Sequence, residues 1–222
     1  MKADLTGKWS GAAALAVCAL LPVAGAAETI PSGLPPAGCE TILTVQANSC
    51  LTTRVWTCPG DPAGQRWYGV QIGGVDVEVN RVDAGFNAVE THYIEDAATV
   101  VQTRVADPVD IRALAKTGTD AFDYVRRGDD GRADERYLGQ MALMGRIEAF
   151  GDEAMHMVHV TYEVFRGDAS IWTGSAVQYL SPDETMLFHG KDYDAEGAEL
   201  TDYRPQVLLA AGAPVPVREC EG

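Results

Sequence analysis

The stretch from Trp67 to Arg81, WYGVQIGGVDVEVNR, is the feature that most constrains how this chain folds. Two alternating runs flank Gly73-Gly74, and a glycine pair suits a two-residue turn whose central residues need positive φ. The apolar residues then form three facing pairs on one face: Ile72 with Val75, Val70 with Val77, and Tyr68 with Val79. A slip of one residue would move these side chains to the polar face, so the register is specified. We expect an antiparallel hairpin in a sheet with one buried side.

Turn signals recur every eight to fifteen residues along the rest of the chain, for example at Asp83-Ala84-Gly85, Gly167-Asp168 and Ser181-Pro182-Asp183. This spacing is typical of an antiparallel meander. About ten strands are expected, which is many for one open sheet, so the sheet should curl or close. We therefore predict a mostly β fold, an antiparallel meander that forms a curved sheet or partial barrel with one short helix.

The predicted helix follows residue 106. Asp107 is expected to cap it, Pro108 suits the first helical position, and Gly118 can end it. A helix of about nine residues is too short to be stable alone, so it must pack on the sheet.

The N-terminus predicts export. Lys2 and Lys8 precede an apolar core at 11–24, and Ala24-Gly25-Ala26 has the small residues of a signal-peptidase site. The apolar run is short for a membrane span, although an uncleaved anchor is the alternative. We divide the chain into a signal peptide at 1–26, a disordered lead-in at 27–38 and one disulfide-stapled β domain at 39–222. The expected location is the periplasm or the extracellular medium.

Four cysteines follow the signal: Cys39, Cys50, Cys58 and Cys220. An even number in an exported chain indicates disulfides. Three pairings are possible. We favour Cys50 with Cys58, which bracket a short alternating run, and Cys39 with Cys220, which would join the two ends of the domain.

The chain is acidic, with a formal net charge of -15. Without Lys2, Lys8 and Asp4 it has 15 basic and 31 acidic residues, a net charge of -16. Such a surface repels nucleic acid and anionic lipid headgroups. The sequence has no nucleophile elbow, phosphate loop or dinucleotide fingerprint. We therefore expect no cofactor, no nucleic-acid partner and no enzymatic activity.

A weak calcium candidate lies near the C-terminus. Asp192, Asp194 and Glu196 alternate before Gly197, as in the first half of a calcium loop. The match then fails, because Tyr203 stands where a bidentate glutamate would close the site. An acidic hairpin turn is the favoured interpretation.

The large aromatic residues after the signal are Trp56, Trp67, Trp172 and eight tyrosines. They could line a ligand cavity, but buried or half-buried sheet positions are the favoured interpretation.

Several motifs together resemble a family of short exported proteins of alphaproteobacteria. The pattern consists of Cys50, Trp56-Thr57-Cys58, Asp61-Pro62-Ala63-Gly64 and Arg66-Trp67. It continues at Asp107-Pro108, Thr117-Gly118-Thr119-Asp120, Phe122-Asp123 and Gln178-Tyr179, and it ends at Cys220. The resemblance implies export and disulfides, and no reaction. The expected architecture is also similar to the periplasmic lipoprotein carrier, a curved sheet with an apolar groove, by analogy of fold only.

Two functions follow as hypotheses. The first is a non-enzymatic envelope protein that binds an apolar or lipid ligand in the concave face of its sheet, which requires an apolar cavity. The alternative is a protein-interaction module without a small-molecule site, which requires a filled interior and an exposed apolar patch or edge strand. The protein partner of such a module is unknown.

Overall fold

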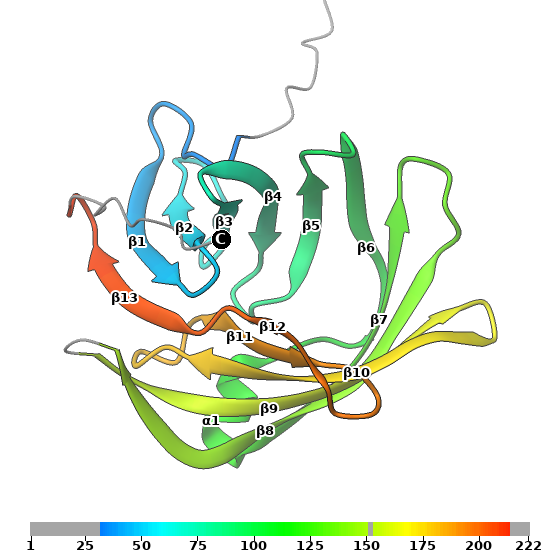
Figure 1. Ribbon diagram of the computed structural model, residues 1–222. Coiled ribbons are helices and arrows are strands. Elements are labelled where there is room, and N and C mark those ends of the chain that lie inside the picture. The colour runs from blue at the N-terminus through cyan, green and yellow to red at the C-terminus, as the bar shows by residue number, and fades with distance from the viewer. Residues whose placement is uncertain (1–31, 151–152, 214–222) are drawn as a thin grey trace, which may run out of the picture.

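The computed structural model describes residues 32–150 and 153–213. These residues form one antiparallel sheet of thirteen strands, which is curved and is not closed into a barrel, together with one short helix (Figure 1). The predicted fold class is therefore confirmed.

The elements follow one another along the chain in this order: β1 (Glu40–Ala47), β2 (Leu51–Thr57), β3 (Arg66–Ile72), β4 (Val75–Val82), β5 (Ala88–Tyr93), β6 (Ala98–Asp107), α1 (Ile111–Thr117), β7 (Thr119–Gly128), β8 (Glu135–Phe150), β9 (Glu153–Arg166), β10 (Ala169–Leu180), β11 (Leu187–Tyr193), β12 (Glu199–Asp202) and β13 (Pro205–Ala210).

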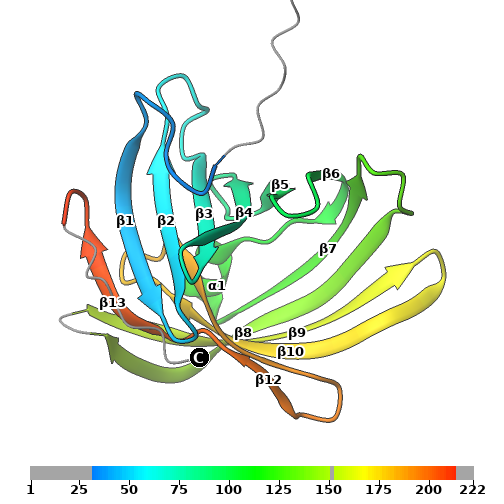
Figure 2. The ribbon, with the colours of Figure 1, turned by 45° about the horizontal axis from the view of Figure 1, so that its top comes forward.

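The sheet is a meander whose last strand returns to its beginning. Strands β1 to β12 pair in sequence order, and β13 then pairs with β1. The two edge strands are therefore β12 and β13, which are joined by only Tyr203 and Arg204. Figures 1 and 2 show how far the sheet curls to bring its two ends together.

The hairpin of β3 and β4 has the predicted turn. Gly73 and Gly74 have φ values of 59° and 82°, and Ile72 lies opposite Val75. Beyond the turn the register shifts, because Val77 is an extra residue in β4 and forms a β-bulge.

The bulge makes two of the predicted pairs wrong. Val70 lies opposite Glu78, and Tyr68 lies opposite Asn80. Val79 turns to the other face of the sheet, where it is fully buried. The backbone of Gly33 covers that face next to Gly69, which lies opposite Val79. A Cβ added to Gly69 would come 2.5 Å from the carbonyl oxygen of Gly33. With both faces buried here, alternation alone does not fix the register.

The helix begins three residues later than predicted. Its N-cap is Asp110, whose side chain accepts hydrogen bonds from two backbone N–H groups of the first turn. Asp107 belongs to β6, where it lies opposite Asp123 of β7. Asn87 then holds Val109 ahead of the helix, because the Val109 N–H donates to Asn87 Oδ1 and the Val109 carbonyl accepts from Asn87 Nδ2. Gly118 ends the helix with φ 85°, as predicted.

The core has two main clusters, which lie on opposite sides of β9. Val158 and Val160 belong to the cluster around α1, whereas Met155 and Met157 belong to the cluster with β1 and β2. Alternate side chains of a strand point to opposite faces. Strand β9 therefore lies between the helix and the first strands of the sheet.

The disulfide in the described residues joins Cys39 to Cys58. The favoured pairing of Cys50 with Cys58 and Cys39 with Cys220 is therefore wrong. Glu40 lies opposite Thr57 at the end of the β1–β2 ladder, which places the two flanking cysteines side by side. Cys50 is also disulfide-bonded, and Cys220 lies outside the described residues.

The predicted signal at 1–26 lies outside the described residues too. Within residues 32–150 and 153–213, we find no helix with the length and apolar character that crossing a membrane requires.

Candidate functional site

The three acidic residues of the calcium candidate serve the β11–β12 hairpin. Asp192 accepts a hydrogen bond from Thr201 Oγ1 at 2.6 Å, and Asp194 Oδ1 accepts from the N–H groups of Glu196 and Ala198. Among the described residues, no three histidine, cysteine, aspartate or glutamate side chains are placed to hold a metal ion. These contacts fit the acidic turn, the interpretation that the sequence favoured.

The tryptophans lie in different environments. Trp56 is buried, with 1% of its surface exposed. Trp67 stacks on His92 and donates from Nε1 to Asp61 Oδ2 at 3.0 Å. Trp172 stacks on Tyr162 with ring centroids 4.4 Å apart. Trp56 and Trp67 lie opposite each other in the β2–β3 ladder, whereas Trp172 lies in β10 opposite Val164 of β9.

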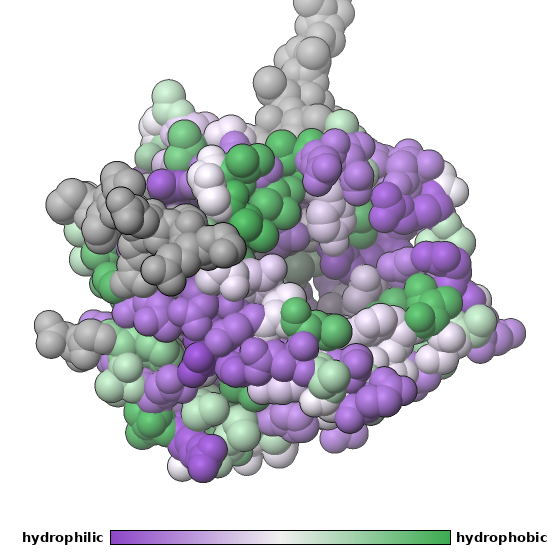
Figure 3. Space-filling model, in the orientation of Figure 1, coloured by the Kyte–Doolittle hydropathy of each residue, from purple (hydrophilic) through white to green (hydrophobic). Residues whose placement is uncertain are grey.

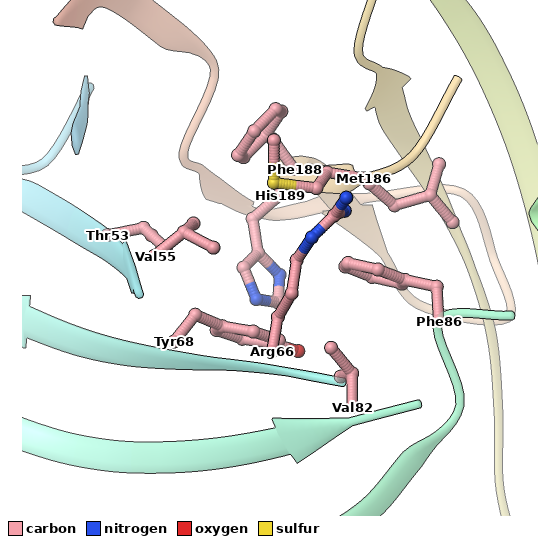
Figure 4. Close-up of a pocket in the computed structure, with 10 residues that line it drawn as sticks. Thr53, Val55, Arg66, Tyr68, Val82, Phe86, Met186, Phe188 and His189 are labelled. Carbon is pink, nitrogen blue, oxygen red and sulfur yellow. The ribbon is translucent and has the colours of Figure 1, made fainter. Parts of the chain in front are cut away.

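The inner cavity lies between strands β2 to β4 and the segment that leads into β11. Figure 4 shows Tyr68 and Phe86 in its wall, where their rings stack 5.9 Å apart, and Arg66 beside them. Arg66 Nη1 donates to the carbonyl of Thr185 at 2.8 Å. The cavity volume is about 10 Å³, enough for roughly one water molecule. This part of the interior is therefore filled by side chains.

A much larger cleft borders the edge strand β13, and we call it the β13 cleft. Its volume is about 630 Å³. It lies between β1 and β13 on one side and, on the other, Phe150 at the end of β8, Glu153 at the start of β9 and the β10–β11 connection. Its apolar lining consists mainly of Ile42, Leu43, Phe150, Met186, Val207 and Leu208.

The rim of the β13 cleft is polar and acidic. Glu153 and Asp183 are exposed acidic residues of its lining, and Ser181 is a buried polar one. Burial raises the pKa of Asp183, but hydrogen bonds from Ser181 Oγ and Thr185 Oγ1 outweigh this effect and lower it. Asp183 is therefore an anion at neutral pH, and the cleft combines an apolar floor with a negative rim.

A broader and more open hollow, of about 730 Å³, lies over β7 to β10. Exposed polar side chains such as Gln140, Thr161 and Thr173 line it. Phe122, Leu138 and Tyr162 line it as well, so its lining mixes polar and apolar side chains.

A second group of side chains, which we call the tyrosine face, consists of Tyr68, Glu78, Tyr93, Tyr124, Arg126 and Tyr137. Strand register places them together. One row of opposite residues crosses five strands. It consists of Tyr68 in β3, Asn80 in β4, Thr91 in β5, Val100 in β6 and Gly128 in β7. Side chains two residues apart share a face. Arg126 and Tyr124 therefore lie on this face, and Tyr137 of β8 lies opposite Tyr124.

The curl of the sheet brings the two ends of the tyrosine face close together. Burial raises the pKa of Tyr68, Glu78 adds to the rise, and Arg126 opposes it although it lies four strands away in the sheet. All six side chains are only partly buried. Figure 3 shows the surface hollowed in the middle of the side of the molecule that it presents.

Arg126 is the most unusual residue of this face. Its guanidinium carbon lies 5.7 Å from the centroid of the Tyr137 ring. Its Nε and Nη2 are buried and have no hydrogen-bond partner. Sequence reasoning missed this residue, although β7 carries a signal: Phe122, Tyr124 and Arg126 alternate, so a cation follows two aromatic residues on an inward face.

Comparison with known proteins gave no further identification: no protein-family model, curated protein or solved structure matches the chain. The resemblance to exported alphaproteobacterial proteins stays a prediction.

Proposed function

We propose that this chain is an exported, non-enzymatic binding protein that holds an apolar or lipid ligand in the β13 cleft. The observation that carries the proposal is the group of large apolar side chains that line that cleft, most of which belong to or pack against one core cluster. Its volume of about 630 Å³ falls within the range of about 300–1,000 Å³ that is typical of small-molecule sites. The inner cavity, at about 10 Å³, has no room for such a ligand.

The floor of the cleft is rigid and therefore preformed. Phe150 and Met186 belong to the core cluster with β1 and β2, and Leu208 packs against that cluster. A preformed apolar floor gains affinity because little ordering accompanies binding.

The rim selects the kind of ligand. Glu153 and the anionic Asp183 lie beside the opening, and the whole chain has a net charge of -15. An anionic headgroup would be repelled at this rim. We therefore propose a ligand with an apolar body and an uncharged or cationic head, such as a neutral lipid.

Export agrees with this role. The disulfide between Cys39 and Cys58 is compatible with an oxidising compartment. The signal pattern at 1–26 supports the periplasm or the extracellular medium as the location. Members of the resembled family are exported as well, which supports the same location.

The binding test uses Nile red, an uncharged fluorescent probe, displaced by a monoacylglycerol. We expect Val207→Asp to weaken binding about tenfold or more, because a charge would be placed against an apolar ligand. Val207 lines the cleft but belongs to no core cluster in the described residues. Val75→Asp is the matched control, since Val75 is 69% exposed at the tip of the β3–β4 hairpin. Equal binding by the two variants would refute the cleft as the site.

The second candidate is a protein-interaction module, and one observation favours it. The cleft borders β13, which is an edge strand of the sheet, and a partner could add a strand there. Native mass spectrometry of protein purified from its own envelope separates the two proposals. A bound lipid mass supports the carrier, whereas repeated ligand-free preparations favour the module.

A further inference from the structure

We propose that the tyrosine face is a second binding site, which takes a monocarboxylate with an apolar body and holds its carboxylate on Arg126. The proposal does not rest on the β13 cleft. It rests on the unpartnered nitrogens of Arg126 and on the hydroxyl groups around them.

The donor geometry of Arg126 fits a carboxylate. A guanidinium group presents its N–H donors in a planar fork that matches the two oxygens of a carboxylate. The ring of Tyr137 contacts the guanidinium at 5.7 Å but accepts none of the in-plane donors. Nε and Nη2 are both buried without an acceptor. A buried N–H group without an acceptor costs free energy. A ligand oxygen that accepts from these groups therefore gains more binding free energy than the same contact at the surface.

Among the described residues, no acidic side chain fills this role. Glu78 shares the face, but its Oε1 accepts from Asn80 Nδ2 at 2.9 Å, and Asn80 Oδ1 accepts from Thr91 Oγ1 at 2.6 Å. This chain of hydrogen bonds holds the Glu78 side chain on β4. No ion pair within 4.0 Å joins Arg126 to an acid in residues 32–150 and 153–213.

The tyrosines supply further donors and apolar contact. Burial raises the pKa values of Tyr68, Tyr124 and Tyr137, so their hydroxyl groups stay protonated at neutral pH. The Tyr137 hydroxyl donates to Glu135 Oε2 at 3.2 Å, which leaves the hydroxyl groups of Tyr68 and Tyr124 as donors for a ligand. The Tyr124 and Tyr137 rings stack 5.3 Å apart, and Tyr124 also contacts Phe122. These rings offer an apolar surface beside the arginine for the body of the ligand.

The charge balance favours a monoanion. Arg126 contributes one positive charge, and Glu78 on the same face contributes one negative charge. A phosphate dianion would leave a larger uncompensated negative charge in a partly buried site, which is costly. Among anions, a monocarboxylate satisfies the fork with the smallest charge imbalance.

The test compares three ligands with the same eight-carbon body: octanoate, octyl phosphate and octanol. Isothermal titration calorimetry is done in 0.15 M salt, where repulsion from distant surface acids is screened. We expect octanoate to bind at least about tenfold more tightly than octanol, which corresponds to one charge-assisted hydrogen-bonded contact. Octyl phosphate should bind more weakly than octanoate, and a stronger response to it would overturn the assignment to a carboxylate.

The matched variants are Arg126→Met and Arg127→Met. Arg127 is the next residue of β7, points to the opposite face and pairs with Asp134 at 2.8 Å. Arg126→Met should abolish the preference for octanoate over octanol, and Arg127→Met should keep it. If Arg126→Met does not fold, Tyr124→Phe keeps the ring and should reduce only octanoate binding. An equal preference in both arginine variants, or none in the wild type, would refute the site.

Binding at Arg126 and binding in the β13 cleft are separable. Val207→Asp should leave the octanoate preference intact while it weakens Nile red binding. Loss of both by Val207→Asp would place octanoate in the cleft and overturn the tyrosine face as a second site.

Discussion

Met186 and Tyr68 line the same inner cavity, and Met186 also forms a wall of the β13 cleft. The Met186 side chain therefore separates the cleft from the interior of the sheet. The β10–β11 connection fixes its position, because Ser181 N–H donates to the Met186 carbonyl and Met186 N–H donates to Ser181 Oγ.

Replacing Met186 with alanine should remove this wall. Met186 is 7% exposed, and truncation of a buried methionine costs about 2–5 kcal/mol of unfolding free energy. Urea denaturation measures the change. We also expect bulkier apolar probes to bind more tightly than to the wild type, because the cleft then opens into the inner cavity. Met144→Ala is the control, since Met144 is 39% exposed. Equal stability of the two variants would contradict the position given to Met186.

The disulfide pairing can be tested directly. A non-reduced digest should yield a peptide pair linked through Cys39 and Cys58. We predict that Cys50 is linked to Cys220, because removal of the predicted signal with Cys18 would leave no other cysteine. Removing the first bond by Cys39→Ala and Cys58→Ala should lower the free energy of unfolding by about 3 kcal/mol. This value is the entropic cost of closing a loop of this length in the unfolded chain. A Cys50–Cys58 peptide would contradict the structure.

Two aspartates near the start of the helix, the observed cap Asp110 and the predicted cap Asp107, can be compared by substitution. Asp110→Ala should cost about 1 kcal/mol, because two N–H groups of the first turn lose their acceptor. Asp107→Ala should have little effect, since Asp107 is exposed at the end of β6. Thermal denaturation of the two variants compares them. A larger loss of stability for Asp107→Ala than for Asp110→Ala would contradict the structure and support Asp107 as the cap.

The junction between the two edge strands should be sensitive to acid. Burial raises the pKa of Asp202, but hydrogen bonds from the side chain and backbone of Arg204 outweigh it and lower the pKa to about 2. The unfolded value is about 3.9. A lowered native pKa stabilises the fold above pH 4, and this contribution is lost as the pH falls from about 4 to about 2.

We therefore expect Asp202→Asn to be less stable than the wild type at pH 7, with a difference that shrinks as the pH approaches 2. Urea denaturation at a series of pH values measures it. The double variant Asp202→Asn, Arg204→Gln should be no less stable than Asp202→Asn alone, because the pair acts as one unit. A difference that stays constant from pH 7 to pH 2 would show that this ion pair contributes nothing.

Turn chemistry made much of the fold predictable. Gly73 and Gly74 adopt the positive φ values that a two-residue hairpin requires, and the meander follows from turns of the same kind. What alternation did not reveal is the extra residue Val77, because bulges depend on what covers each face. Gly33 and its neighbours bury the second face around Val79, and that contact comes from a distant part of the sequence.

The other errors also come from contacts between distant residues. Asn87 binds both backbone groups of Val109 and β7 pairs with Asp107, so the helix cap moves to Asp110. The pairing of Cys39 with Cys58 follows from the β1–β2 register, which the sequence leaves open. The apolar cleft depends on where β13 returns beside β1, which no local pattern specifies.

The central claim is that the β13 cleft holds an apolar ligand. Methyl NMR of protein labelled at methionine and leucine tests it most directly, with a monoacylglycerol as the titrant. The account predicts large shifts of the Met186, Leu43 and Leu208 methyl signals, which line the cleft, and none for the exposed Met144. Saturating ligand that leaves those three signals unmoved, or that shifts only methyl groups elsewhere, would contradict it.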